Sequence, residues 1–318
     1  MKEIGGYIEL EYNKGTLFHD TAVPLNCGRR ALSYLIKSRN IDKIWLPKFM
    51  CSSVEEPCRK AGISIEYYSI GEDLRPIDLI APSNDWVYLI NYYGQINKEE
   101  IKQIYSSHKN LIVDNAQAFF QLPVKGIDTI YNCRKYFGVS DGAFLYTDAQ
   151  LDEELSRDES YAHMQFLLGR MERTASEFYN EYNKNNHRFD EEPMKRMSIL
   201  TENLLRGIDY DFVAERRSAN FIFLHQQFAR INKLNISVPV GPYMYPLYIE
   251  DGERIRKELQ KRKIYIPTLW PDVFNHCASD TVEYNMAENI LPLPIDQRYG
   301  QEEMQIIIDS LREVSQWI

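Results

Sequence analysis

Residues 111–120, LIVDNAQAFF, begin like a buried strand and then turn abruptly polar. The first three residues suit the interior of a sheet, yet the strand runs into an acid and two amides with no glycine or proline to close it. A second unusual stretch follows at residues 132–147, NCRKYFGVSDGAFLYT, in which Lys135 precedes two aromatic residues and an Asp-Gly pair. We interpret the two stretches together.

Composition narrows the class of protein. The chain has 318 residues, 44% hydrophobic and 26% charged, which is typical of a globular protein with one large and one smaller domain. A net charge of −9 argues against a nucleic-acid partner, which would favour a basic face. An anionic substrate would therefore need a local cluster of donors.

The cysteines and the N-terminus indicate where such a protein works. The five cysteines are scattered, form no CxxC pair and have no histidine at ligand spacing, so we expect reduced thiols and no metal site. The N-terminus MKEIGGYIELEY lacks an apolar signal core, and no window approaches a membrane span. These features predict a cytoplasmic protein that does not enter a membrane.

Strand and helix patterns alternate along the first half of the chain. Apolar runs predict strands at residues 42–47, 63–70, 86–93, 110–114, 128–133 and 142–147. Helical patterns lie between the earlier runs, at residues 27–38, 52–62 and 98–108. This alternation predicts an α/β fold with a mainly parallel sheet covered on both faces. Because such sheets bind ligands beyond the carboxyl ends of their strands, Asp114 is placed where a ligand would lie.

The second half changes character. Residues 151–200 are highly charged with a helical pattern, and the polar run at 180–193 is predicted to be a mobile loop. A long helix is expected at 210–234, then a strand at 243–249, a helix at 252–263 and a closing helix at 301–317. We therefore divide the chain into a large α/β domain, residues 1–205, and a small C-terminal α+β domain, residues 206–318.

Three polar residues acquire meaning only as a set. Asp114 alone would be a turn cap, Lys135 alone a solvated cation, and Gln117 alone carries no signal. Together they match the needs of pyridoxal phosphate, which requires a lysine for a Schiff base and an acid beside its ring nitrogen. The acid keeps that nitrogen protonated, so that the ring can accept electrons.

Pyridoxal phosphate also needs an anion cradle for its phosphate. The run NCGRRAL places Gly28 at the start of a predicted helix, directly after a loop. Backbone N–H groups around Gly28 and Arg29 can point at an anion there. The order in the chain is cradle, acid and then lysine.

These residues resemble those of a known family, the DegT/DnrJ/EryC1/StrS aminotransferases, which mostly aminate keto sugars on nucleotides. VDNAQAF is similar to the family's Asp-x-Ala-Gln-Ala motif, and RKYFGVSDGA to its lysine followed seven residues later by glycine. NYYGQ, KRMSILTENLL with the later ERR, RKIYIPTLWP and NILPLPID resemble further family segments across nearly the whole chain. The resemblance implies a fold-type I architecture with a mainly parallel seven-stranded sheet between helices.

The resemblance also implies a role for each residue. Lys135 would bind pyridoxal phosphate covalently and shuttle a proton, and Asp114 would pair with the ring nitrogen. Gln117 would hydrogen-bond the phenolic oxygen of the cofactor, and Gly28 and Arg29 would hold its phosphate through backbone groups. An amino donor, expected to be glutamate, would supply the amino group that is transferred to a keto sugar or sugar nucleotide in surface-polysaccharide or related sugar biosynthesis.

The chain departs from the family pattern at two places in the site. The family's phosphate-binding serine, five residues before the lysine, is Ile130 here, and either Asn132 or Arg134 is a candidate replacement. Asn132 is counted among the predicted cofactor-binding residues. The position where many members stack an aromatic ring on the cofactor is Cys51. Phe49 or a tyrosine of NYYG is a candidate for that role, and the residues alone do not choose.

Other departures leave alternative functions open. The family's Glu-Gly-Gly is Asp141-Gly142-Ala143, the chain is shorter than most members, and residues 151–195 match poorly. A pyridoxal-phosphate lyase or dehydratase on the same fold is one alternative, although such dehydratases replace the lysine. A non-catalytic scaffold is the other. The resemblance implies a homodimer with shared active sites.

Overall fold

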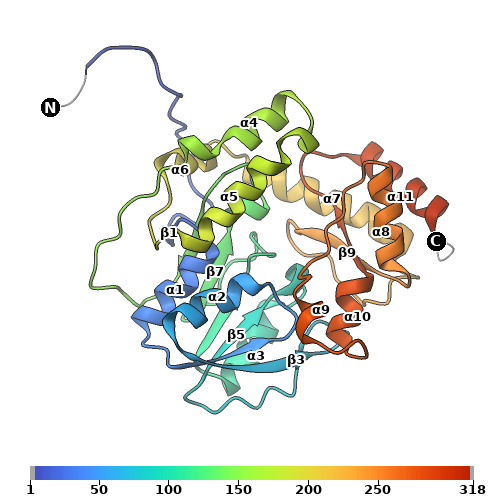
Figure 1. Ribbon diagram of the computed structural model, residues 1–318, viewed down its shortest axis with the longest axis horizontal. Coiled ribbons are helices and arrows are strands. Elements are labelled where there is room, and N and C mark those ends of the chain that lie inside the picture. Colours follow the sequence, from blue (N-terminus) through green and yellow to red (C-terminus); the bar gives the residue numbers. More distant parts are fainter. Residues whose placement is uncertain (1–3, 316–318) are drawn as a thin grey trace.

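The structure is a computed structural model that describes residues 4–315, and an eight-stranded sheet forms its centre (Figure 1). The strands are β1 (Val23–Leu25), β2 (Lys43–Pro47), β3 (Ser64–Ile70), β4 (Pro76–Ile77), β5 (Trp86–Ile90), β6 (Leu111–Asp114), β7 (Asp128–Asn132) and β8 (Ala143–Tyr146). Their order in the sheet is β1-β8-β7-β6-β5-β2-β3-β4. The five strands from β7 to β3 run parallel, whereas β8 is antiparallel to both of its neighbours and β4 is antiparallel to β3.

The predicted α/β class with a mainly parallel sheet is confirmed. The sheet has one strand more than the seven expected, because the two residues of β4 pair with the end of β3. The expected number came from the resemblance; the apolar runs themselves predicted six strands and missed both β1 and β4, which at three and two residues are too short to show a periodicity.

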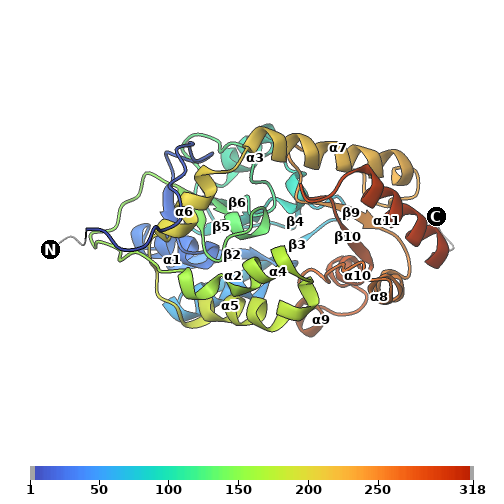
Figure 2. The ribbon, with the colours of Figure 1, turned by 90° about the horizontal axis from the view of Figure 1, so that it is seen from above.

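Three helices connect the parallel strands and cover the sheet. They are α1 (Gly28–Ser38), α2 (Ser52–Ala61) and α3 (Lys98–Ser107). Figure 2 shows α1 and α2 on one side of the sheet and α3 on the other. The helix ends follow from local chemistry: Asn97 and Glu100 form a capping box at the start of α3, and Gly62, with a φ of 68°, ends α2.

The middle of the chain is helical where a loop was expected. It contains α4 (Gln165–Glu172), α5 (Tyr179–Glu191) and α6 (Ile199–Arg206). The prediction of a mobile loop at residues 180–193 is wrong, because α5 occupies most of that range. Polar composition concealed a helix whose few buried residues, Asn185 and Phe189, lie four apart on one face.

Buried arginine contacts fix the end of α5 against the start of α1. The Arg30 side chain donates from Nε to the carbonyl of Glu192 at 2.7 Å and from Nη2 to the carbonyl of Phe189 at 2.8 Å. A cation at the C-terminus of a helix satisfies carbonyls that lack partners within the helix. The helix is therefore stabilised by tertiary contacts that its own sequence does not reveal.

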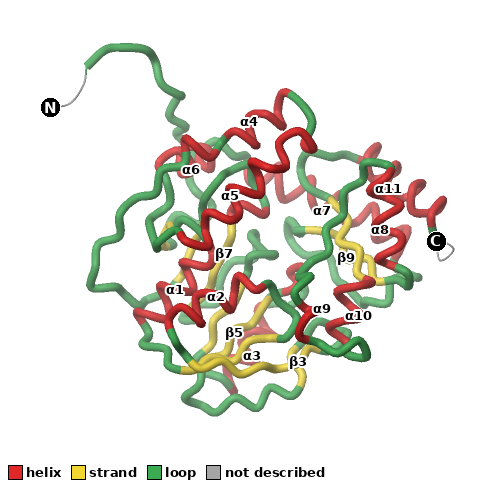
Figure 3. The backbone as a smooth tube through the Cα atoms, in the orientation of Figure 1, coloured by secondary structure: helices red, strands yellow, loops and turns green. Residues whose placement is uncertain are grey.

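The C-terminal part forms a smaller layered unit (Figure 3). Its elements are α7 (Tyr210–Phe228), β9 (Met244–Tyr248), α8 (Gly252–Lys261), α9 (Val273–His276), α10 (Val282–Asn289), β10 (Ile290–Pro294) and α11 (Gln301–Val314). β9 and β10 pair antiparallel, and α7, α8 and α11 pack around them. The domain boundary at residue 205 stays a prediction, because one hydrophobic cluster joins this part to the large sheet.

The last helix begins at Gln301 as predicted but ends before the described Ser315, which is extended. α11 ends at Val314, and the residues 316–317 that the prediction also included lie outside the described part. Within residues 4–315, no helix is both long and apolar enough to cross a membrane.

The Asp141-Gly142 pair after Lys135 forms a buried turn that contacts the start of α6. The buried carboxylate of Asp141 accepts hydrogen bonds from the backbone N–H and the hydroxyl of Ser198, both at 2.8 Å. Gly142 has a φ of 118°, and a Cβ there would lie 3.1 Å from the Thr201 side chain and 3.3 Å from that of Cys133. This turn joins β8 to the start of α6.

We expect Gly142→Ala to destabilise the protein more than Gly126→Ala. Both glycines have positive φ, which strains alanine by about 1 kcal/mol, but Gly126 has open space around it. Crowding at Gly142 should add roughly 1–3 kcal/mol to the loss of unfolding free energy. Urea denaturation of the two variants measures the difference, and equal losses would show that the turn has room for a methyl group.

Candidate active site

The carboxyl ends of β5, β6 and β7 meet the starts of α1 and α2 at a cavity of about 270 Å³. All the residues predicted from the sequence to form the site line this cavity: Gly28, Arg29, Asp114, Gln117, Asn132 and Lys135. The position agrees with the general rule for ligand sites in open parallel sheets. The fold therefore brings these six residues together around one cavity, although more than a hundred positions separate Gly28 from Lys135 in the sequence.

The Asp114 carboxylate is buried and oriented by two donors. Oδ1 accepts the backbone N–H of Ala116 at 2.8 Å, and Oδ2 accepts the hydroxyl of Tyr88 at 3.0 Å. Burial and the neighbouring Asp114 charge raise the pKa of Tyr88 well above its ordinary value. The hydroxyl therefore stays protonated and acts as the hydrogen-bond donor to the carboxylate. The acid at the end of β6 is thus held in a fixed position facing the cavity.

Tyr88 is a site residue that the sequence analysis missed. It lies inside the apolar run of β5, two positions before Ile90, whose register partner is Asp114. Its only signal was a hydroxyl in an otherwise apolar buried strand, which needs a hydrogen-bond partner. To predict that this partner is Asp114, one would also need to know that β5 and β6 are neighbours in the sheet.

Gln117 presents its amide nitrogen to the cavity. Its Oε1 accepts the backbone N–H of Tyr93 at 2.7 Å, which fixes which end of the side-chain amide is oxygen. Nε2 makes no hydrogen bond to any residue in the range 4–315. The side chain is therefore available to donate to an oxygen of a bound molecule.

Lys135 ends a short 3-10 turn, η2 (Cys133–Lys135), which Asn132 begins by accepting the Arg134 N–H at 3.0 Å. Its Nζ lies 5.6 Å from the centre of the Tyr243 ring. Among the described residues, Nζ has neither an ion pair nor a hydrogen bond. The amine is thus free to react at the cavity.

The backbone around this lysine is rigidly supported. The carbonyl of the next residue, Tyr136, accepts hydrogen bonds from Arg217 Nη2 at 3.2 Å and from Gln297 Nε2 at 2.8 Å. Both donors belong to the C-terminal part of the chain. These bonds orient the turn that carries Lys135.

The start of α1 has open backbone donors. Cys27 precedes it in extended conformation without a side-chain cap, and the first turn contains no acidic residue. The N–H groups of Arg30 and Ala31 bond to the Cys27 carbonyl, which leaves those of Gly28 and Arg29 for a ligand. An anion at this end is favoured by the helix dipole.

Glycine leaves the space for that anion. A Cβ on Gly28 would project toward the cavity and lie 3.7 Å from Asn132 Nδ2. The side chain of Arg29 forms an ion pair with Asp190 of α5, which holds part of its guanidinium away from the start of the helix. The use of the backbone groups of Gly28 and Arg29 by a phosphate stays a prediction.

Asn132 and Arg134, the two candidates to replace the missing serine hydroxyl, both line the cavity. Asn132 Nδ2 faces the start of α1 and makes no hydrogen bond within residues 4–315. The Arg134 guanidinium donates to Asn186 and lies 4.7 Å from the Phe189 ring centre. Ile130 also lines the cavity and offers only an apolar surface.

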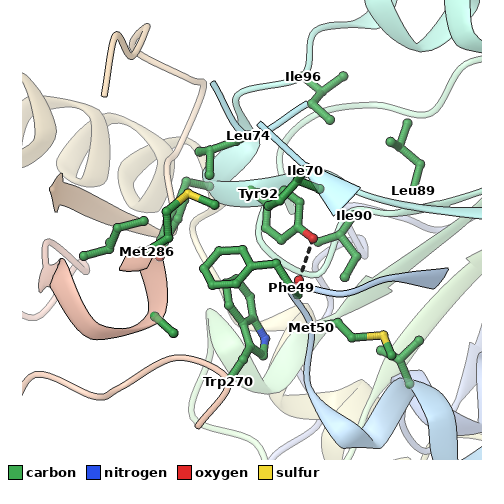
Figure 4. Close-up of a cluster of buried hydrophobic side chains, with 14 of the residues drawn as sticks. Phe49, Met50, Ile70, Leu74, Leu89, Ile90, Tyr92, Ile96, Trp270 and Met286 are labelled. Atoms are coloured by element: carbon green, nitrogen blue, oxygen red, sulfur yellow. Dashed lines mark hydrogen bonds between the residues drawn. The ribbon is translucent and has the colours of Figure 1, made fainter. Parts of the chain in front are cut away.

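Three aromatic residues, Tyr88, Phe189 and Trp270, line the cavity, and none of them is among those considered from the sequence for stacking on a cofactor. Phe49 and the tyrosines of NYYG are buried and do not line it, whereas Trp270 does. Figure 4 shows Trp270 packed against Phe49 and Tyr92. Cys51 lines the cavity just before α2.

A second cavity of about 440 Å³ shares Arg134 and Lys135 with the first. It lies against α4, α5 and the C-terminal part. Its other cations and rings are Arg170, Arg217, Arg298, Tyr136, Phe137, Phe166, Phe178, Tyr179, Tyr182 and Tyr265. Asp296 also lines it and pairs with Arg298, whereas Arg134 and Arg170 have no ion pair within residues 4–315. Such a lining suits an anionic molecule with a flat ring.

Comparison with solved structures identifies the fold. The chain superposes on DesV of S. venezuelae with a TM-score of 0.66 and 17% identity, covering 93% of this chain and 85% of DesV. It matches the sugar aminotransferase CalS13 of Micromonospora echinospora with a TM-score of 0.63 and 11% identity, over 92% and 87% of the two chains.

The chain has the fold of the sugar aminotransferases. A third structure with this fold, NtdA of Bacillus subtilis with its cofactor PMP bound, gives a TM-score of 0.62 at 14% identity, over 92% of this chain and 73% of NtdA. No protein-family model matches the sequence, and no curated protein matches it either. The sugar-aminotransferase fold confirms the resemblance at the level of architecture.

We expect Asp190→Asn to loosen α5. The substitution removes the ion pair with Arg29 that joins α5 to the start of α1. Glu191→Gln is the matched control, because the Glu191 side chain is exposed and forms no ion pair among the described residues. Hydrogen exchange should become several-fold faster in residues 179–191 of the Asp190 variant, with the central strands unchanged. Equal exchange in the two variants would contradict this function of the ion pair.

Proposed function

We propose that the protein is a pyridoxal-phosphate-dependent aminotransferase that transfers an amino group, from glutamate, to a keto sugar linked to a nucleotide. The observation that carries the proposal is the convergence on one cavity of a free lysine amine, a fixed carboxylate and a helix start with open donors. Each of the three meets a separate chemical need of that cofactor. The sugar-aminotransferase fold supports the same assignment.

The donor set fits pyridoxal phosphate. A phosphate would take the N–H groups of Gly28 and Arg29 and the unpaired Nδ2 of Asn132, beside the guanidinium of Arg134. This arrangement gives the dianion both a helix dipole and a nearby positive charge without the family's serine hydroxyl. Ala116 offers a low surface next to Asp114, which leaves room for a flat ring.

Pyridoxal phosphate, when bound, supplies a ring that accepts the electrons released at the substrate carbon. Asp114 holds a proton on the ring nitrogen, and Tyr88 keeps the carboxylate oriented for this. Gln117 Nε2 donates to the phenolic oxygen of the ring. Lys135 Nζ would hold the cofactor covalently and would be the group that moves the proton at the substrate carbon.

The second cavity supports the assignment of the acceptor. Arg170 stands at it without an ion pair within residues 4–315, and Arg134 borders both cavities, so a substrate phosphate would meet uncompensated cations. The neighbouring tyrosine and phenylalanine rings offer surfaces for a base. A nucleotide-linked keto sugar would thus lie beside Lys135. A homodimer is part of the proposal, on the strength of the resemblance.

We expect purified protein to bind pyridoxal phosphate with a visible absorption band, and borohydride to fix the cofactor on Lys135. Lys135→Ala should abolish both effects, because no other amine among the residues that line the cavity can replace it. Lys125→Ala, an exposed lysine ten positions earlier, is the control and should behave as wild type. Mass spectrometry of the reduced protein locates the cofactor, and its attachment to another lysine, or to none, would overturn the assignment.

Adding glutamate should bleach the visible band as the amino form of the cofactor accumulates. A cofactor that binds but does not respond to any amino donor would favour the lyase or dehydratase alternative. A protein that stays colourless with added cofactor would favour a scaffold. The same spectrum therefore separates the three functions.

We expect Asp114→Asn to retain cofactor and lose turnover, because the amide cannot hold a proton on the ring nitrogen. The loss should be about 100-fold or more in kcat, as for removal of other preorganised charges. Tyr88→Phe removes one bond to the same carboxylate and should cost about tenfold. Asp152→Asn is the exposed control. Near wild-type turnover in the Asp114 variant would reduce the acid to a turn cap.

A further inference from the structure

Three aromatic rings line the first cavity, and two of them are engaged. The Tyr88 hydroxyl donates a hydrogen bond to Asp114, which fixes the position of that ring. The Phe189 ring is covered by guanidinium groups, with Arg134 at 4.7 Å and Arg188 at 4.4 Å from its centre. Trp270 is the third, and the contacts of its ring to other rings are edge-on.

The Trp270 ring is held from behind by two buried rings (Figure 4). Its centre lies 4.6 Å from that of Phe49 at an interplanar angle of 71°, and 5.5 Å from that of Tyr92 at 80°. The side chain is 8% exposed, so the cavity is the open space that it borders. Edge-to-face packing of this kind fixes the orientation of an aromatic ring.

The backbone at Trp270 is strained. Its φ is 60°, in the left-handed region that costs a bulky residue on the order of 1–2 kcal/mol. The loop is nevertheless tied down: Asp272 Oδ2 accepts the backbone N–H of Ser52 at 3.2 Å, and the Val273 N–H bonds to the Trp270 carbonyl at 3.0 Å. Strain of this kind persists where the surrounding structure over-determines a conformation, often in ligand sites.

We propose that Trp270 packs its ring against the ring of the bound cofactor. The start of α2 cannot supply an aromatic surface, because Cys51 lines the cavity there. The C-terminal part of the chain then provides the aromatic wall that α2 lacks, from a loop anchored to the first residue of α2. This inference rests on the proposed function, since it requires pyridoxal phosphate in the cavity.

Cofactor affinity in matched variants tests the proposal. Trp270→Leu should raise the dissociation constant for pyridoxal phosphate by about tenfold or more, the scale of other ring-stacking contacts. Trp270→Phe should restore most of the affinity, because it keeps a ring. Trp86→Leu, the same change at the start of β5 and outside the cavity lining, should leave affinity within about twofold of wild type on the same scale. Wild-type affinity in Trp270→Leu would overturn the proposal.

A second measurement needs no destabilising variant. In protein labelled with 5-fluorotryptophan, addition of pyridoxal phosphate should move the Trp270 fluorine resonance more than those of Trp45 and Trp86, which do not line the cavity. Trp270→Phe assigns the resonance. A Trp270 signal that moves no more than the others, in protein that binds the cofactor, would overturn this inference and leave the proposed function standing. If added pyridoxal phosphate produced no visible absorption band in the wild-type protein, both this inference and the proposed function would be overturned.

Discussion

A carboxylate buried at the end of a parallel strand needs donors that do not move, and the site depends on how Asp114 obtains them. One donor is the backbone two residues later, which any tight turn after β6 supplies. The other is the hydroxyl of Tyr88 on the adjacent strand, whose raised pKa keeps it a donor. Because strand pairing sets the distance between β5 and β6, the register of the sheet positions the acid.

The other side of the cavity depends on arginines that hold α5 against α1. Arg30 satisfies two carbonyls at the end of α5, and Arg29 pairs with Asp190 on the same helix. These contacts use the side chains and leave the backbone at the start of α1 open. The same pair of residues thus fixes the helix that covers the cavity and preserves the donors that face into it.

Most of the fold and the central residues of the site were predictable from the sequence. The period of the apolar runs predicted the parallel strands, and the residues that the sequence grouped as a candidate site, among them Gly28, Asp114 and Lys135, line one cavity. What remained hidden depends on contacts between distant segments. The helix α5 has few apolar residues and is held in part by the buried Arg30, a contact between distant segments. Trp270 lies in a turn-rich stretch that Asp272 ties to the start of α2.

The lining of the first cavity also has an order in time. Most of its residues lie between positions 27 and 135, Phe189 follows, and Leu269 and Trp270 come last. During synthesis the N-terminal part emerges first and can begin to fold while later residues are still being added. A nascent chain that has formed its sheet therefore carries the lysine, the acid and the helix start beside an open wall. That side of the cavity can be covered only after Leu269 and Trp270 have been synthesised.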